Sequence, residues 1–250
     1  MSFAVPAQAY GRFMGRFSEP LSGVFADFAE VGTGNALDVG CGPGALTRVL
    51  VDRLGAGNVT AVDPSEPFVA AARETFPDCD IRQAKAEALP FEDGSFDQAL
   101  AQLVVHFMDD PAEGLREMLR VTRTGGTVAA CVWDHAGDGS PLSLFWRAVK
   151  AIDPDAHDES ALAGATQGDL TRLLKQAGAQ EVTETSISVD VAFTSYDEWW
   201  DPFTLGVGPA GEYVAGLDEA RTAELRAACK ELLPPEPFVV TATAWAARGH

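Results

Sequence analysis

The chain has 250 residues, of which 46% are hydrophobic; this composition suits a folded domain with a substantial core and excludes wholesale disorder. Its formal net charge is −19, from 37 acidic residues against 18 Lys and Arg. The simplest consequence of this charge is solubility. It also repels phosphate backbones and anionic lipid headgroups, so we expect no nucleic acid as partner and no stable membrane insertion.

Targeting segments and metal-ligand patterns are not evident in the sequence. No apolar run reaches the roughly 18 residues of a membrane span, and residues 1–20 lack the unbroken apolar segment of a signal peptide. We therefore expect a cytoplasmic protein. The four cysteines are scattered without a C-x-x-C pair, and the four histidines do not fall at ligand spacing, so neither a disulfide framework nor a metal site is predicted.

Short apolar runs alternate with amphipathic stretches from residue 35 to residue 133. Such alternation predicts a parallel sheet with right-handed crossovers, and this half is expected to be doubly wound α/β. The expected strands lie within 35–40, 58–63, 79–85, 95–105 and 125–133. The expected helices begin near Leu46, at 65–76 with Ser65 as N-cap, and around Leu115 and Met118.

The alternation stops after Trp133. Residues 134–166 hold Gly, Asp, Pro and Ser around one apolar stretch, "LSLFWRAVKAI". An interruption of this length inside a compact domain is typical of a cap over a site.

Regular elements return in the last third of the chain. A helix is expected at about 169–177, with Thr166 and Asp169 in a capping arrangement and Gly178 as its stop. Two further strands are expected at 181–193 and 237–249, separated by "YDEWWDPF", a glycine-rich loop and a helix near 218–233. The expected organisation is one domain over 1–250, with a helical lid (1–34), a ligand-binding core (35–133) and cap insertions (134–166 and 196–217).

The segment "LDVGCGPGAL" (37–46) places glycines at 40, 42 and 44 directly after an apolar run that carries Asp38. Glycine at this density is costly to order, so the loop needs positive φ angles or close backbone approach. A purely structural turn is one interpretation. A dinucleotide fold is another, because Gly40, Gly42 and Ala45 satisfy G-x-G-x-x-G/A and Asp63 lies near the distance of a ribose-binding acid.

The third interpretation is a resemblance. "LDVGCGPG" resembles the first motif of class I S-adenosylmethionine-dependent methyltransferases, in which an acid before the first glycine is typical. "VDPS" (62–65) and two longer segments, "AEALPFEDGSFDQALAQLVVHFMDDP" and "LREMLRVTRTGGTVAACVW", resemble the methyltransferases of ubiquinone and menaquinone biosynthesis, the methyltransferase type 11 group. The motifs occur in order over 36–133. The resemblance implies a Rossmann-like, doubly wound, mostly parallel seven-stranded sheet and S-adenosylmethionine as cofactor, with S-adenosylhomocysteine as product.

The resemblance also implies a set of cofactor contacts. Backbone N–H groups of the loop meet the methionine carboxylate where a helix begins, and the Asp63 carboxylate accepts both ribose hydroxyls. Pro64 and Leu103 lie near the adenine, with Ala86 and Glu87 at its edge, whereas Gln102 faces the methionine end. The implied cofactor-binding residues are Gly40, Cys41, Gly42, Asp63, Pro64, Ala86, Glu87, Gln102, Leu103 and Tyr10.

Two further points follow from the resemblance. Members often carry an acid at the position of Lys85, so a polar contact to the adenine amino group is missing or replaced here. "YGRFMGRFSEPLS" (10–22) resembles the leading helix that folds over the cofactor, where Tyr10, Phe13 and Met14 would screen the sulfonium from water. Packing alone is the other interpretation of that helix.

Methyl transfer is an in-line displacement that depends chiefly on alignment, and it needs a general base only if the nucleophile must first lose a proton. His106, after the fourth strand, is a candidate base, and His135 on the rim is a weaker one; packing is the alternative for both. Trp199 and Trp200 are adjacent in the sequence. Either one of them is expected to line an acceptor pocket, or both belong to the core of the cap. We expect a small, partly apolar acceptor and a monomer or homodimer. A non-catalytic cofactor-binding protein and a nicotinamide-dependent reductase are the alternative functions.

Overall fold

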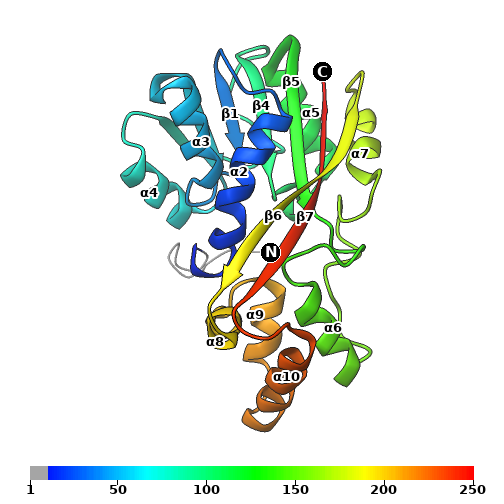
Figure 1. Cartoon of the computed structure of the whole chain (residues 1–250). Coiled ribbons are helices and arrows are strands. Elements are labelled where there is room, and N and C mark those ends of the chain that lie inside the picture. The colour runs from blue at the N-terminus through cyan, green and yellow to red at the C-terminus, as the bar shows by residue number, and fades with distance from the viewer. Residues whose placement is uncertain (1–10) are drawn as a thin grey trace.

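Seven strands form one sheet in the order β3-β2-β1-β4-β5-β7-β6 in the computed structural model, which describes residues 11–250 (Figure 1). β1 to β5 pair in parallel, and β7 is antiparallel to both β5 and β6. β6 therefore runs in the same direction as the first five strands. The expected doubly wound, mostly parallel seven-stranded sheet is confirmed.

The strands fall where the apolar runs predict them. They are β1 (Ala36–Val39), β2 (Val59–Asp63), β3 (Asp80–Gln83), β4 (Phe96–Gln102), β5 (Thr122–Trp133), β6 (Thr183–Phe193) and β7 (Phe238–Gly249). The longer helices are α2 (Arg16–Phe28), α3 (Ala45–Leu54), α4 (Glu66–Thr75), α5 (Pro111–Val121), α6 (Ser143–Ile152), α7 (Asp169–Ala177), α9 (Gly208–Ala215) and α10 (Glu219–Leu232). Shorter turns are η1 (Gly11–Gly15), η2 (Ala56–Asn58), η3 (Val105–Phe107), α8 (Tyr196–Trp200) and η4 (Asp201–Leu205).

Helices cover both faces of the sheet and bury separate apolar clusters. Leu46 and Leu50 of α3 share one cluster with Phe25 of α2, whereas α5 and α7 contribute Leu115 and Leu170 to the cluster on the other face. These residues are all 2% exposed or less. Apolar residues at helical spacing thus bind each helix to the sheet, which fixes the ends of the strands where ligands bind in such folds.

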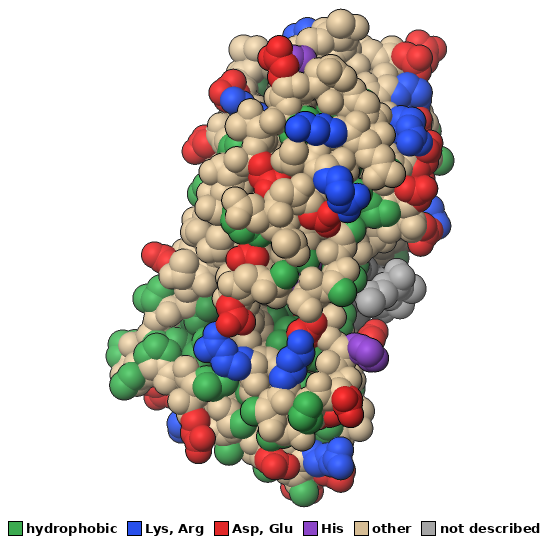
Figure 2. Space-filling view, turned by 90° about the vertical axis from the view of Figure 1, so that its right-hand side faces the viewer, with side chains coloured by type: hydrophobic (Ala, Val, Ile, Leu, Met, Phe, Trp, Pro, Cys, Tyr) green, Lys and Arg blue, Asp and Glu red, His purple; other side chains and the backbone are tan. Residues whose placement is uncertain are grey.

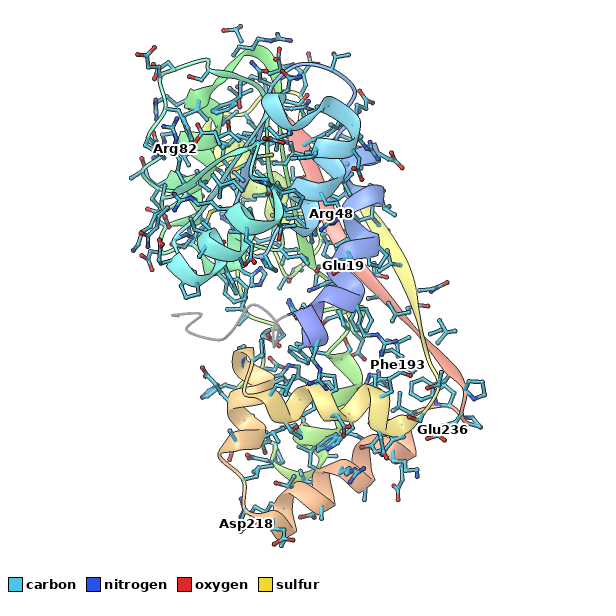
Figure 3. The ribbon with its side chains drawn as sticks, turned by 90° about the vertical axis from the view of Figure 1, so that its left-hand side faces the viewer. Glu19, Arg48, Arg82, Phe193, Asp218 and Glu236 are labelled. Carbon is cyan, nitrogen blue, oxygen red and sulfur yellow. The ribbon has the colours of Figure 1, made fainter. Side chains whose placement is uncertain are left out.

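A helical cap lies below the sheet, at the far end of the β6–β7 ribbon (Figure 1). Figure 3 shows Phe193 and Glu236 near the end of this ribbon, where the Tyr196 amide donates a hydrogen bond of 2.6 Å to Glu236 Oε1. In Figure 2, hydrophobic side chains gather over the cap, and charged ones are spread over the sheet above it. No helix in the described part is both long and apolar enough to cross a bilayer.

Two local predictions are wrong. Residues 196–217 are not a glycine-rich loop but the helical elements α8, η4 and α9, because their aromatic side chains pack together: Trp199 and Phe203 have ring centroids 4.8 Å apart. Thr166 and Asp169 do not cap α7; Gly168 occupies the N-cap with φ 85°, and Asp169 Oδ2 accepts the Gly164 amide at 2.7 Å. Gly178 ends that helix as predicted, with φ 113°.

Candidate active site

A cavity of about 450 Å³ lies where β1, β2 and β4 end, beside the glycine loop and the start of α3. β1 lies between β2 and β4, so the strand order reverses here, and ligands of open α/β sheets bind at such a switch point. The volume falls within the range of small-molecule sites. Its lining includes Ser18, Asp38, Gly40, Cys41, Gly42, Asp63, Pro64, Gln102, Leu103 and Phe107.

The three glycines of the loop serve different purposes. All have positive φ angles: 73° at Gly40, 53° at Gly42 and 102° at Gly44. A Cβ on Gly40 would lie 2.5 Å from Val104, and one on Gly44 would lie 2.4 Å from Phe76, so both positions are packed against neighbours. A Cβ on Gly42 would meet no atom within 4 Å. Gly42 is therefore the glycine whose missing side chain leaves space in the cavity.

The amide groups of the loop correct one expectation. Gly40 and Cys41 both donate to the Val62 carbonyl, Gly44 donates to Cys41, and Gly42 donates to Asp63 Oδ2 at 2.9 Å. These N–H groups hold the loop in shape and are already used. The first turn of α3, where Ala45 and Leu46 line the cavity, instead supplies N–H groups without intrahelical acceptors.

Asp63 ends β2 and is only 6% exposed. Its Oδ2 accepts the Gly42 amide and its Oδ1 accepts the Ser65 amide at 2.8 Å. Burial raises the pKa of this carboxyl, and the two backbone hydrogen bonds oppose that shift. Each oxygen of a carboxylate has two lone pairs, so one on each remains for a ligand diol.

A second buried carboxyl, Asp38, lines the same cavity and was not among the predicted contacts. Its Oδ2 accepts a 2.6 Å hydrogen bond from Thr47 Oγ1. Burial raises the pKa of Asp38 to about 7. A cationic ligand group beside it would favour the ionised form.

The end of β4 combines an orphaned polar atom with backbone strain. Gln102 Nε2 donates to the Ser18 carbonyl (3.0 Å) and to Ser22 Oγ (2.9 Å), both on α2, whereas its Oε1 is buried without a partner among residues 11–250. Leu103 has φ 61°, which is costly for a branched side chain and is typical of positions where function requires strain.

Two of the implied cofactor contacts, Ala86 and Glu87, do not line the cavity. Ala86 packs in the apolar cluster beneath α5, and Glu87 Oε1 accepts the Asp109 amide at 2.7 Å, so neither side chain lines the cavity wall. Lys85 Nζ pairs with Asp109 at 2.7 Å on the surface. The physical reason is that Glu87 and Lys85 hold the loop before α5. Tyr10 lies outside the described residues.

A smaller cavity of about 40 Å³ adjoins the first, and Leu103 and Phe107 line both. It is enclosed by η1, the ends of β4 and β5, and the cap, through Phe13, Met14, His106, Trp133, His135, Leu142, Glu159, Val207, Gly208, Pro209 and Ala210. Three buried atoms of this lining have no partner within the described protein: His106 Nδ1, Trp133 Nε1 and His135 Nε2. Unpaired buried polar atoms are rare and indicate that a ligand or water supplies the missing bonds.

Both histidines of this cavity are neutral near pH 7. Burial lowers the pKa of His106 well below its ordinary value, and it lowers the pKa of His135 to about 4. Their ring centroids lie 5.8 Å apart. Both line this smaller cavity, but imidazoles with such low pKa values are weaker general bases than an ordinary histidine. Trp199 and Trp200, 3% exposed, belong to the cap core and line neither cavity.

The donor set fits S-adenosylmethionine. The first cavity offers a buried carboxylate with free lone pairs at Asp63 for a ribose diol, a second carboxyl at Asp38 for a cation, and the open space at Gly42. When bound, the cofactor supplies a methyl group on positively charged sulfur.

Within residues 11–250, no group of three or more His, Cys, Asp or Glu side chains is arranged to hold a metal ion.

Comparisons with known proteins agree with this fit. Residues 37–130 match the family model described as a methyltransferase domain. The chain is 31% identical to a malonyl-[acyl-carrier protein] O-methyltransferase of Pseudescherichia vulneris, over 73% of this chain and 70% of the relative. It is 30% identical to a demethylmenaquinone methyltransferase of Renibacterium salmoninarum, over 61% of this chain and 69% of the relative.

A likeness in structure extends over nearly the whole chain. The crystal structure of the YcgJ protein from Bacillus subtilis aligns with a TM-score of 0.58 over 91% of this chain and 96% of that one. Its sequence identity is 17%, so this likeness concerns the fold alone. The sequence relatives establish that the chain belongs to the class I S-adenosylmethionine-dependent methyltransferases, in the group that includes the malonyl-acyl-carrier-protein and demethylmenaquinone methyltransferases.

Proposed function

We propose that the chain transfers a methyl group from S-adenosylmethionine in the first cavity to a small, partly apolar acceptor whose reacting atom enters the second. Gly42, Asp63, Pro64, Gln102 and Leu103 surround the cofactor in this proposal. The rate enhancement comes mainly from alignment of nucleophile and methyl group.

The observation that carries the proposal is the shared wall of the two cavities. Leu103 and Phe107 line both, so a ligand in the first cavity and one in the second meet at these residues. Apolar side chains such as Phe13 and Leu142 suit an apolar acceptor, and the unpaired atoms of His106 and Trp133 suit its polar end. His106 acts here as a neutral hydrogen-bonding group.

The size of the second cavity implies that the cap moves. About 40 Å³ admits a few water molecules but no complete substrate. In this proposal η1 and α2 form the lid, and segments 134–166 and 196–217 form a cap that opens for the acceptor and closes to exclude water. β6 ends on the same side as β5, so both insertions start at the correct edge of the sheet.

The alternative functions predict different behaviour. A non-catalytic binding protein would bind the cofactor without turnover, and a reductase would bind NADH. The test is to incubate the protein with methyl-tritiated S-adenosylmethionine and a small-molecule cell extract, and to look for a labelled product. Ala210, fully buried on α9 beside the second cavity, provides the blocking variant Ala210→Leu. We expect product with the wild type and none with this variant, at unchanged cofactor affinity. Equal product from both would place the acceptor elsewhere.

A further inference from the structure

We propose that the methyl acceptor is an uncharged hydroxyl compound and that the carboxyl group of Glu159 receives the hydrogen bond of its hydroxyl. This inference rests on the proposed function, because it assigns a chemical class to the acceptor of that site. It was not foreseeable from the sequence, where Glu159 stands in "DAHDESALAG" without any distinguishing pattern.

Glu159 is buried at the junction of two cavities. It is 5% exposed and lines both the second cavity and a third one of about 300 Å³ on its other side. Its Oε2 accepts a 2.6 Å hydrogen bond from Trp146 Nε1, which fixes the carboxyl group in place. A buried carboxyl with one protein partner retains capacity for a ligand donor.

The charges around Glu159 exclude an acidic ligand. No Lys or Arg occurs among the described residues that line the second cavity, and Glu159 is its one carboxyl. The cations of the third cavity are engaged: Lys150 pairs with Asp158, and Arg147 pairs with Asp138 at 2.8 Å. A carboxylate or phosphate ligand would therefore be buried beside Glu159 without a counter-charge among the described lining residues, which is unfavourable.

The unpaired atoms favour a hydroxyl over an ammonium. Trp133 Nε1–H is a buried donor without an acceptor in the described part of the chain, and the indole nitrogen can only donate. A hydroxyl oxygen can accept this hydrogen bond while its own hydrogen is donated to Glu159. An ammonium group has donors only, leaves Trp133 unsatisfied, and adds the desolvation cost of a buried ion pair.

The remaining lining is compatible with the body of such a compound. Phe13, Phe107 and Leu142 provide apolar contacts, and the neutral imidazoles of His106 and His135 accept or donate single hydrogen bonds. Burial, reinforced by the charge of Asp158, raises the pKa of Glu159 to about 7. Above that pH the carboxylate is a hydrogen-bond acceptor only, which sharpens the discrimination against anions.

Three one-ring probes of different charge test the inference: phenol, benzylamine and benzoate. Each is titrated by calorimetry or ligand-observed NMR at about pH 8 into full-length protein saturated with S-adenosylhomocysteine. At that pH phenol is neutral and Glu159 is mostly ionised. We expect phenol to bind about tenfold or more tightly than benzoate, with benzylamine in between. In Glu159→Gln, which keeps an acceptor for Trp146, the preference for phenol over benzoate should shrink to about threefold or less.

Asp155→Asn is the matched control, because Asp155 is a nearby acid that is exposed and lines none of the three cavities. It should leave the order of the three probes unchanged. Benzoate binding as tightly as phenol, no binding of phenol, or an undiminished preference in Glu159→Gln would overturn the inference. The saturation step keeps the two proposals apart. Failure to bind S-adenosylhomocysteine contradicts the proposed function, whereas its binding with equal affinities for the probes contradicts the assigned acceptor class alone.

Discussion

The carboxylate of Asp63, at the end of β2, accepts the backbone N–H of Gly42 at 2.9 Å and so ties the second strand to the middle of the glycine loop. One side chain thereby shapes the loop and also faces the cavity. The fold and the site are coupled at this contact. A substitution at either residue is therefore expected to change both the stability of the protein and its affinity for the cofactor, in different proportions.

Replacing Asp63 with Ala should weaken S-adenosylmethionine binding by about 2 kcal/mol, because charge-assisted hydrogen bonds to a ligand diol are lost. The melting temperature should also fall, since the amides of Gly42 and Ser65 lose their acceptor. Calorimetry and thermal unfolding measure the two effects. Asp80→Ala is the control, an exposed aspartate of β3 that pairs with Arg82 outside the cavity. Unchanged affinity in a folded Asp63→Ala protein would refute the assignment.

Gly42→Val should abolish cofactor binding, because the new side chain enters the open space of the cavity. Its φ of 53° also makes a β-branched residue costly, so we expect a loss of stability on the order of 1 kcal/mol. Gly55→Val is the matched control: φ is 83°, no atom lies within 4 Å of its Cβ, and the residue is not on the cavity wall. Both variants should lose stability, and the Gly42 variant alone should lose affinity. Retained binding would mean that Gly42 serves the turn only.

Asp38 should make the protein less stable as the pH rises. Its pKa is about 7 in the folded chain against an ordinary 3.8, so below the lower value both states are protonated. Between the two values the unfolded chain ionises while the folded chain keeps its proton. The free energy of unfolding therefore falls across this window and levels off above it.

Asp38→Asn cannot ionise and still offers Thr47 an acceptor. Between about pH 5 and pH 8, we expect the free energy of unfolding to fall less for this variant than for the wild type. The two decreases should differ by on the order of 3 kcal/mol. Glu159, whose pKa rises to about 7 from 4.5, contributes a slope of the same sign in both proteins. Urea unfolding at the two pH values measures the difference. Parallel slopes for the two proteins would show that Asp38 is ionised throughout.

The cap should become less dynamic when an acceptor binds. Hydrogen exchange is measured for the protein alone, with S-adenosylhomocysteine, and with S-adenosylhomocysteine plus phenol. The cofactor product should slow exchange mainly in 36–103, and the phenol should add protection in 134–166 and 196–217 because closure shields the amides of α6 and α9. Protection that stays within 36–103 after phenol is added would contradict a closing cap.

The sequence predicts the sheet well and the cap poorly. Strands such as β1 and β2 are short, mostly apolar and buried runs next to glycines, and their parallel pairing follows from the rules for strands that alternate with helices. The fold of 196–217 depends on contacts such as Trp199 against Phe203 and Phe145 stacked on Phe203 at 4.6 Å. Phe145 and Phe203 belong to segments far apart in the sequence, so local propensity could not reveal the helices that this contact stabilises.

The same division holds in the site. Gly42 and Asp63 stand in a local motif, and the structure places both on the wall of the first cavity. The resemblance implies that Glu87 lies at the edge of the adenine, yet its carboxylate accepts the Asp109 amide, which is 22 residues away in the sequence. Asp38 belongs to the same motif, but its burial, which raises its pKa, depends on the packing of the folded chain and cannot be derived from the motif.

Binding selectivity between S-adenosylmethionine and NADH distinguishes a methyltransferase site from a dinucleotide site. Calorimetry is performed on the wild type with S-adenosylmethionine and, separately, with NADH, and is repeated on Asp63→Ala. The account predicts one S-adenosylmethionine per chain, a weaker affinity by about 2 kcal/mol in the variant, and no heat of binding with NADH. Tight binding of NADH, or S-adenosylmethionine binding that is indifferent to Asp63, would contradict it.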